Sequence, residues 1–153
     1  MSTRCQIKIK DSKEMNYADG NIHIYKHSDG YPSDVLPVLV PFVKRFFKER
    51  GFDPTYLLCQ IVRAFAVRDF QDAQGKDPLE GFQCCKKEGD NFHSRQDYQG
   101  WGLDCDRHGD IRYLYEIDEK GDIFVNGVLV TEGVYKKLIK ENSKFEIPVL
   151  ELK

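Results

Sequence analysis

The sequence lacks the features that would send a protein into or across a membrane. No apolar run approaches the ~20 residues that a transmembrane helix needs, and the N-terminal stretch MSTRCQIKIK has no apolar core of a signal peptide. It also lacks an excess of charge of one sign, since 23 basic and 25 acidic residues leave a net charge of −2. We therefore expect an intracellular, cytoplasmic protein with no membrane partner, and no global basic field predicts nucleic-acid binding.

Recognised catalytic and cofactor motifs are missing as well. There is no Walker loop, no dinucleotide fingerprint, no nucleophile elbow and no C-x-x-C pair. The odd number of five cysteines favours free thiols in a reducing compartment. A zinc site is conceivable, but adjacent cysteines are not the usual chelating spacing; its members would be Cys84, Cys85, His93, Cys105 and His108. We predict no cofactor, with a divalent metal as the alternative.

The residues that are present indicate one folded domain. Hydrophobic residues make up 41% of the 153, which argues against disorder. Residues 4–10 and 22–26 alternate with the period of a strand, and the Asp-Gly-Asn turn signal at 19–21 lies between them. They predict an antiparallel hairpin.

Two helical patterns follow. The first follows Pro32 and stops at Gly51, with Ser33 as its N-cap, and Pro37 and Pro41 predict that it starts late or is kinked. The second begins at Asp53-Pro54, where Asp caps and Pro occupies the first helical position, and extends to about residue 72.

The second half of the chain returns to strands. Residues 73–100 are polar and Gly-rich, which indicates a functional loop or hidden short strands. WGLDCD and IRYLYEID predict a hairpin, Asn126-Gly127 predicts a second, residues 132–141 a short helix capped by Thr131, and KFEIPVLEL a closing edge strand. The fold class is α+β: one domain over 1–153, a mainly antiparallel sheet with two longer helices and one short C-terminal helix packed on one face.

The stretch HSDGYP at 27–32 is the first candidate site. Ordinary turn chemistry accounts for Asp29, Gly30 and Pro32. It does not require the side chains of Tyr25, His27 or Tyr31. The catalytic candidates here are His27, Asp29 and Tyr31, and the alternative is a plain strand-to-helix turn.

The second candidate is LDCDRHGDIRYLYE. Asp104, Asp106, His108 and Asp110 are hard ligands within seven positions, although the spacing fits no known metal loop. Asp104, Asp106 and His108 are weak metal candidates, and His108 and Asp110 are further catalytic candidates. A solvated hairpin tip explains the same residues. If the two stretches meet across the sheet, His27, Asp29, His108 and Asp110 would form one polar cluster.

Aromatic and cationic residues supply a set of candidates for macromolecular binding. Rings beside a cation stack on bases, and they also make hot spots in protein interfaces. The set comprises Tyr25, Tyr31, His93, Arg95, Tyr98 and Trp101.

YKHSDGYP at 25–32 and GDIRYLYEID at 109–118 resemble segments of small phage and prokaryotic proteins without an established activity. In those proteins a Y-(K/R)-H-x-D-G-Y-P stretch precedes a helix, and G-D-(I/L)-x-Y-x-Y follows later. The resemblance does not cover residues 73–100. It implies a viral or mobile-element setting and directs attention to residues 25–32.

Three hypotheses follow. The first is an interaction protein that binds a host or viral macromolecule, a protein in the first instance, with nucleic acid left open. The alternative is a small metal-dependent hydrolase, a nuclease or phosphodiesterase, that uses His27 and Asp29 with His108 and Asp110. The third is binding of a small anion at the turn before the first helix.

Overall fold

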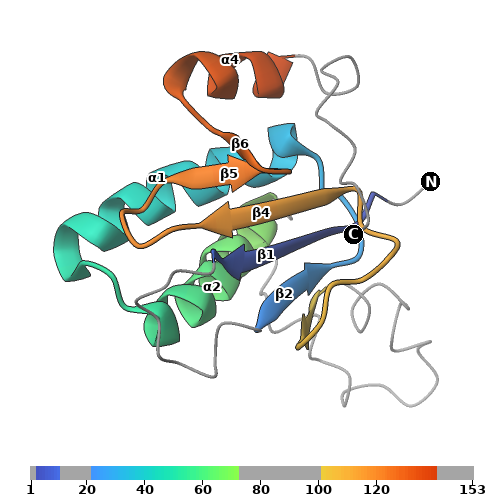
Figure 1. Cartoon of the computed structure of the whole chain (residues 1–153), viewed down its shortest axis with the longest axis horizontal. Coiled ribbons are helices and arrows are strands. Elements are labelled where there is room, and N and C mark those ends of the chain that lie inside the picture. Colours follow the sequence, from blue (N-terminus) through green and yellow to red (C-terminus); the bar gives the residue numbers. More distant parts are fainter. Residues whose placement is uncertain (1–2, 11–21, 73–100, 141–153) are drawn as a thin grey trace.

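The computed structural model describes residues 3–10, 22–72 and 101–140, which form an α+β fold (Figure 1). The strands are β1 (Cys5–Ile9), β2 (His23–Lys26), β3 (Trp101–Asp104), β4 (Tyr113–Ile117), β5 (Ile123–Val125) and β6 (Val128–Leu129). The helices are α1 (Pro32–Arg50), α2 (Pro54–Asp72) and α4 (Glu132–Lys140). The loop predicted at 73–100 and the strand predicted in KFEIPVLEL lie outside the described residues.

The six strands form one sheet in the order β3-β2-β1-β4-β5-β6. All neighbours are antiparallel except the central pair β1 and β4, which run parallel. The hairpin predicted from residues 4–10 and 22–26 is confirmed as β1 and β2. The Asn126-Gly127 turn is confirmed between β5 and β6, with φ of 48° and 82° as a type I′ turn requires.

The predicted hairpin between WGLDCD and IRYLYEID is wrong. β3 pairs with β2 at one edge of the sheet, whereas β4 pairs with β1 and β5 near its centre. Alternation identifies a strand and its buried face, but it does not identify the neighbour. The connection 105–112 therefore crosses the sheet instead of closing a tight turn, and this crossing builds the candidate site.

Helix α1 begins earlier than its prolines predicted. Its N-cap is Tyr31, whose carbonyl accepts hydrogen bonds from the N–H groups of Asp34 and Val35 at 2.9 Å. The predicted cap at Ser33 is therefore wrong, and so is the late start, one of the two alternatives that the prolines offered. Pro32 fits the first position because its missing N–H would have no helical acceptor there. The helix continues through Pro37 and Pro41.

The other helix ends match their sequence signals. Gly51 ends α1 at a φ of 75°. The Asp53 carboxylate accepts a hydrogen bond from the Tyr56 N–H at 3.3 Å at the start of α2. Thr131 caps α4 through its hydroxyl, which accepts from the Val134 N–H at 3.3 Å.

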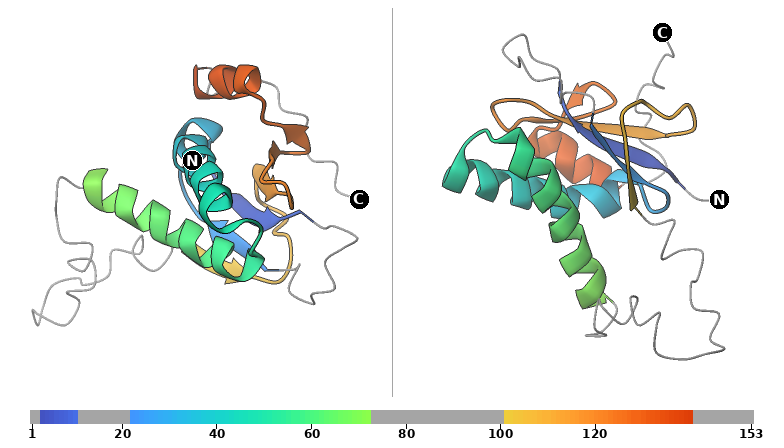
Figure 2. Two further views of the ribbon diagram at one scale, coloured as in Figure 1. Left: turned by 90° about the vertical axis from the view of Figure 1, so that its left-hand side faces the viewer. Right: turned by 90° about the horizontal axis from the view of Figure 1, so that it is seen from below.

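The hydrophobic core lies between one face of the sheet and the helices α1 and α2, and α4 packs against α1 (Figure 2). Alternate residues of β1 and β4 face this core, as the strand period predicted. The fully buried core residues of the strands and helices include Ile7, Ile24, Leu36, Leu39, Leu57, Ile61, Phe65, Tyr115 and Ile117. Within the described ranges, no helix has the length and apolar character needed to cross a bilayer.

Candidate functional site

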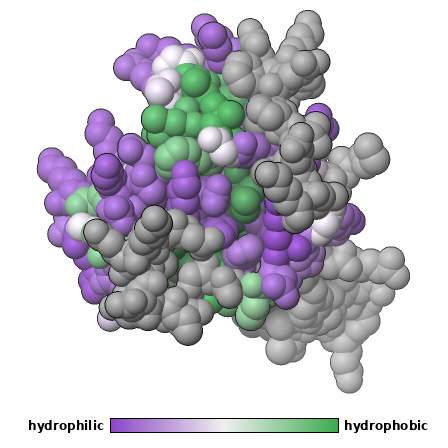
Figure 3. All heavy atoms as spheres, viewed as in Figure 1, coloured by the Kyte–Doolittle hydropathy of each residue, from purple (hydrophilic) through white to green (hydrophobic). Residues whose placement is uncertain are grey.

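The middle of the sheet face opposite α1 and α2 is polar. Because Cys5, Ile7 and Ile9 of β1 point into the core, Gln6 and Lys8 point to the opposite face. Pairing places Tyr25 of β2 beside Gln6. Figure 3 views this face and shows hydrophilic residues over its middle. The candidate site lies here, away from the core.

Gln6 fixes the crossing connection 105–112 to this face. Its amide nitrogen donates to the Asp106 carbonyl at 3.0 Å, and its amide oxygen accepts from the His108 N–H at 3.1 Å. The Gln6 side chain is fully buried, so these two hydrogen bonds also satisfy its own buried amide group. No pattern in the sequence indicates this role, because Gln6 is one polar residue in an ordinary alternating strand.

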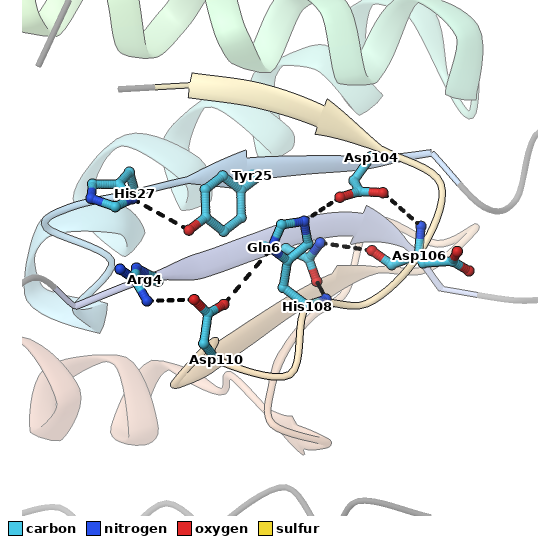
Figure 4. Close-up of polar contacts among 8 residues, drawn as sticks. All are labelled: Arg4, Gln6, Tyr25, His27, Asp104, Asp106, His108 and Asp110. Atoms are coloured by element: carbon cyan, nitrogen blue, oxygen red, sulfur yellow. Dashed lines mark hydrogen bonds and ion pairs between the residues drawn. The ribbon is translucent and has the colours of Figure 1, made fainter. Parts of the chain in front are cut away.

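His108 lies at the centre of a polar cluster that we define as Arg4, Tyr25, His27, Asp104, His108 and Asp110 (Figure 4). Its ring stacks on Tyr25, with centroids 4.5 Å apart and planes inclined by 27°. Its Nε2 contacts the Asp104 carboxylate, and its Nδ1 lies 3.7 Å from Asp110 Oδ1. Carboxylates therefore face both imidazole nitrogens.

The rest of the cluster extends along β1 and β2. The Tyr25 hydroxyl lies 3.4 Å from His27 Nδ1, and the Arg4 guanidinium pairs with Asp110. The structure thus brings three of the four predicted residues, His27, His108 and Asp110, into one network.

Two pKa shifts describe the electrostatics of the cluster. The backbone N–H of Asp106, the His108 side chain and the Cys105 N–H donate to the Asp104 carboxylate and lower its pKa. Desolvation and the nearby Asp110 carboxylate raise the pKa of Tyr25, so this phenol stays protonated at neutral pH. At neutral pH the lowered pKa keeps Asp104 ionised and the raised pKa keeps the Tyr25 phenol neutral.

Asp29 takes a different place from the one the cluster hypothesis gave it. It lies in the turn at a φ of 53°, and its backbone carbonyl accepts from Lys26 Nζ at 3.0 Å. No contact among the described residues joins its carboxylate to the polar cluster. Its role here is conformational, because Asp is one of the few residues besides Gly that adopts this backbone region readily.

The remaining residues of HSDGYP hold the turn against β1. A Cβ on Gly30 would lie 2.8 Å from Cys5 Cβ and 2.9 Å from the Thr3 carbonyl oxygen, so only glycine fits. The Gly30 N–H donates to that same Thr3 carbonyl at 2.8 Å, and the buried Tyr115 hydroxyl donates to the Gly30 carbonyl at 2.8 Å. The half-buried Tyr31 contacts Tyr113 at 6.2 Å between ring centroids.

A buried lysine that the sequence interpretation overlooked completes this turn. Lys26 is only 5% exposed, and its ammonium group donates to the Ser28 carbonyl and lies 3.4 Å from the Asp34 carboxylate. Arg68 of α2 approaches the same carboxylate at 3.2 Å. A lysine inside an alternating strand looks solvent-facing in sequence, and nothing there identifies its carbonyl partners.

A groove of about 670 Å³ lies where α2 passes the β3 edge of the sheet. We call it the β3 groove. Its lining is apolar except for Thr55, Cys59 and Arg63; the apolar part comprises Ile9, Ile22, Pro54, Leu58, Val62, Ala66, Trp101 and Leu103 with the backbone of Gly102. The Leu103 side chain is 74% exposed and Ile22 is 40% exposed.

Trp101 is the one predicted binding residue that lines this groove. Its ring packs against Phe65 of α2, with centroids 4.9 Å apart and planes tilted by 48°. His93, Arg95 and Tyr98 lie outside the described residues. The exposure of Leu103 could not be predicted from the sequence. Leu103 lies on the same face of β3 as Trp101, which is the face toward the core, so alternation predicts that its side chain is buried.

The metal candidates do not converge on one point. The Asp106 side chain points away from Asp104 and His108 (Figure 4), and its backbone carbonyl is bonded to Gln6. Across the part of the chain that the structure describes, no group of three or more His, Cys, Asp or Glu side chains is placed to hold a metal ion. Of the residues considered for zinc, Cys84, Cys85 and His93 lie outside that part.

The thiols that are described differ in environment. Burial raises the pKa of the Cys5 thiol to about 12, so it packs in the core as an unreactive side chain. Cys59 and Cys105 are exposed.

Comparisons with protein-family models, with curated proteins and with solved structures find no match.

Proposed function

We propose that this protein acts by binding another protein in the β3 groove. The observation that supports the proposal is the pair of exposed apolar side chains, Leu103 and Ile22, on the rim of an apolar groove. Exposed apolar surface of this kind around a concave site is typical of an interaction site. Covering one leucine side chain is worth roughly 1.5–3 kcal/mol, which corresponds to about ten- to a hundredfold in affinity.

The resemblance to phage proteins at residues 25–32 favours a host or viral protein as the partner. The chain is close to neutral, with a net charge of −2, so the proposal relies on the apolar groove and not on a charged field. Nucleic acid remains the less favoured partner for that reason.

The hydrolase hypothesis would use the polar cluster. In its favour, Tyr25 links His27 to His108, which in turn lies near Asp110. Against it, carboxylates of the chain face both nitrogens of His108, which leaves neither aimed at a substrate, and Asp29 lies in the turn. General base catalysis requires a nitrogen within reach of the proton that it abstracts. The geometry therefore supports binding better.

The test is selection of short peptides from a random displayed library on the wild-type protein. The single Trp of the chain, Trp101, lines the groove, so its fluorescence reports occupancy directly. Selected peptides should shift this emission, and Leu103→Glu should weaken them at least about tenfold. Because Leu103 is exposed, this variant should fold normally.

Leu129→Glu is the matched control. Leu129 is 41% exposed on β6, at the opposite edge of the same sheet, so it receives the same change away from the groove. It should leave the affinity unchanged. Peptides that bind Leu103→Glu as tightly as wild type, or that lose equal affinity in both variants, would count against the groove as the binding site.

A further inference from the structure

We infer that the partner presents an extended, acidic peptide segment that adds to the sheet as a strand beside β3; this inference rests on the proposed function of the β3 groove. Strand β3 ends the sheet order, and the only strand that pairs with it in the described part of the chain is β2. In an antiparallel ladder, alternate residues direct N–H and C=O away from the existing neighbour. Part of the backbone of Trp101–Asp104 therefore faces outward, as in a sheet edge that accepts an added strand.

The groove lies on the correct side of that edge to take side chains. Trp101 and Leu103 share one face of β3 and both line the groove, while Asp104 lies on the polar face. A strand added beside β3 would direct every second side chain into the groove, toward Leu58 and Val62 of α2. Apolar residues at alternate positions of the partner fit this arrangement.

Arg63 specifies the charge of the occupant. Of the described residues that line the groove, it is the one with a charge, and it is exposed on α2. Within the described ranges, Arg63 makes one long hydrogen bond of 3.5 Å to the Gln60 side chain, and no carboxylate pairs with it. A Glu or Asp of the partner, at a position whose side chain points into the groove, would supply the carboxylate that pairs with Arg63.

The same charge disfavours a second copy of this chain as the occupant. Pairing of two β3 strands would bring a second Arg63 into the shared groove beside the first. The copy's Asp104 could not compensate, because it lies on the polar face and already accepts bonds from Cys105, Asp106 and His108. A like-charge pair at an interface opposes association.

The probe is a synthetic peptide that alternates Thr and Val, with one Glu in place of a central Val. We expect saturable binding by Trp101 fluorescence and slowed amide exchange within residues 101–104 on NMR. The same peptide with every backbone amide N-methylated keeps its side chains but has no N–H to donate to a strand on either edge. It should bind at least about tenfold more weakly.

A charge swap tests the role of Arg63. Replacing the peptide's Glu with Lys should weaken binding at least about tenfold, and Arg63→Glu should restore binding of the Lys peptide. Arg63 is exposed, so the variant should fold.

Three outcomes would overturn the inference. The first is N-methylated peptide that binds as tightly as the parent. The second is that the alternating peptide does not bind, while library-selected peptides do bind and lose affinity in Leu103→Glu. That result would contradict the added strand but leave the proposed binding in the groove intact. The third is a dimer by light scattering that Leu103→Glu dissociates, which would identify a second copy as the occupant.

Discussion

The polar cluster and the β3 groove differ in how completely the chain satisfies its own groups. In the cluster, His108 is held by two carboxylates and the Tyr25 ring, and Gln6 bonds both backbone groups that it reaches. In the groove, Leu103 is 74% exposed and Arg63 has no carboxylate partner among the described residues. Residues of the types that suggest chemistry are thus in contact with one another, whereas apolar side chains at the groove stay exposed.

The largest effect on the fold should come from Gly30→Ala. The added Cβ would lie within 3 Å of atoms of Thr3 and Cys5, two of them backbone, and we expect a loss of about 3 kcal/mol in the free energy of unfolding. Urea denaturation followed by circular dichroism measures it. Gly133→Ala in α4, where a Cβ meets nothing within 4 Å, is the control and should be neutral or slightly stabilising. Equal stability of the two variants would remove the structural role assigned to the turn.

Gln6→Leu should have the next largest effect. It leaves the Asp106 carbonyl and the His108 N–H without their buried partner, which costs about 2 kcal/mol in unfolding free energy. Amide exchange should also become faster across residues 105–112. Asp106→Ala is the control, because only the backbone of Asp106 is bonded to Gln6. If Gln6→Leu were as stable as wild type, the crossing would be held by something else.

The smallest effect should be a pH dependence centred on Asp104. Its pKa is lower in the folded protein than in the unfolded chain, so its contribution to stability is present above the unfolded value of about 3.9 and is lost as the pH falls through the folded value. Asp104→Asn should therefore be less stable than wild type near neutral pH, and the two unfolding curves should converge at low pH. A stability difference that stayed constant with pH would contradict this role for the carboxylate.

Local patterns in the sequence sufficed for most of the elements. Alternation gave the hairpin of β1 and β2, Asn126-Gly127 gave the turn between β5 and β6, and Asp53-Pro54 gave the start of α2. Each is decided by residues within a few positions of one another. The start of α1 was misjudged because tertiary packing holds Pro37 and Pro41 within a helix that propensity alone disfavours.

Long-range relations could not be obtained in that way. That β3 joins β2, and that β4 lies parallel to β1, depends on pairing between segments 75 to 108 residues apart. The proximity of His27 to His108 and Asp110 follows from that pairing. The sequence could therefore predict the cluster only on the condition that the two segments lie side by side in the sheet. The buried roles of Gln6 and Lys26 depend on backbone carbonyls and N–H groups, which every residue carries and no pattern identifies.

The most direct test measures stability and peptide affinity together for Gln6→Leu and Leu103→Glu. Gln6→Leu should lose about 2 kcal/mol of unfolding free energy and, under conditions where it is folded, keep the wild-type affinity for library-selected peptides within about twofold. Leu103→Glu should keep its stability within about 0.5 kcal/mol and lose at least about tenfold in affinity. The opposite pattern, with binding lost in folded Gln6→Leu and retained in Leu103→Glu, would place the binding site on the polar face.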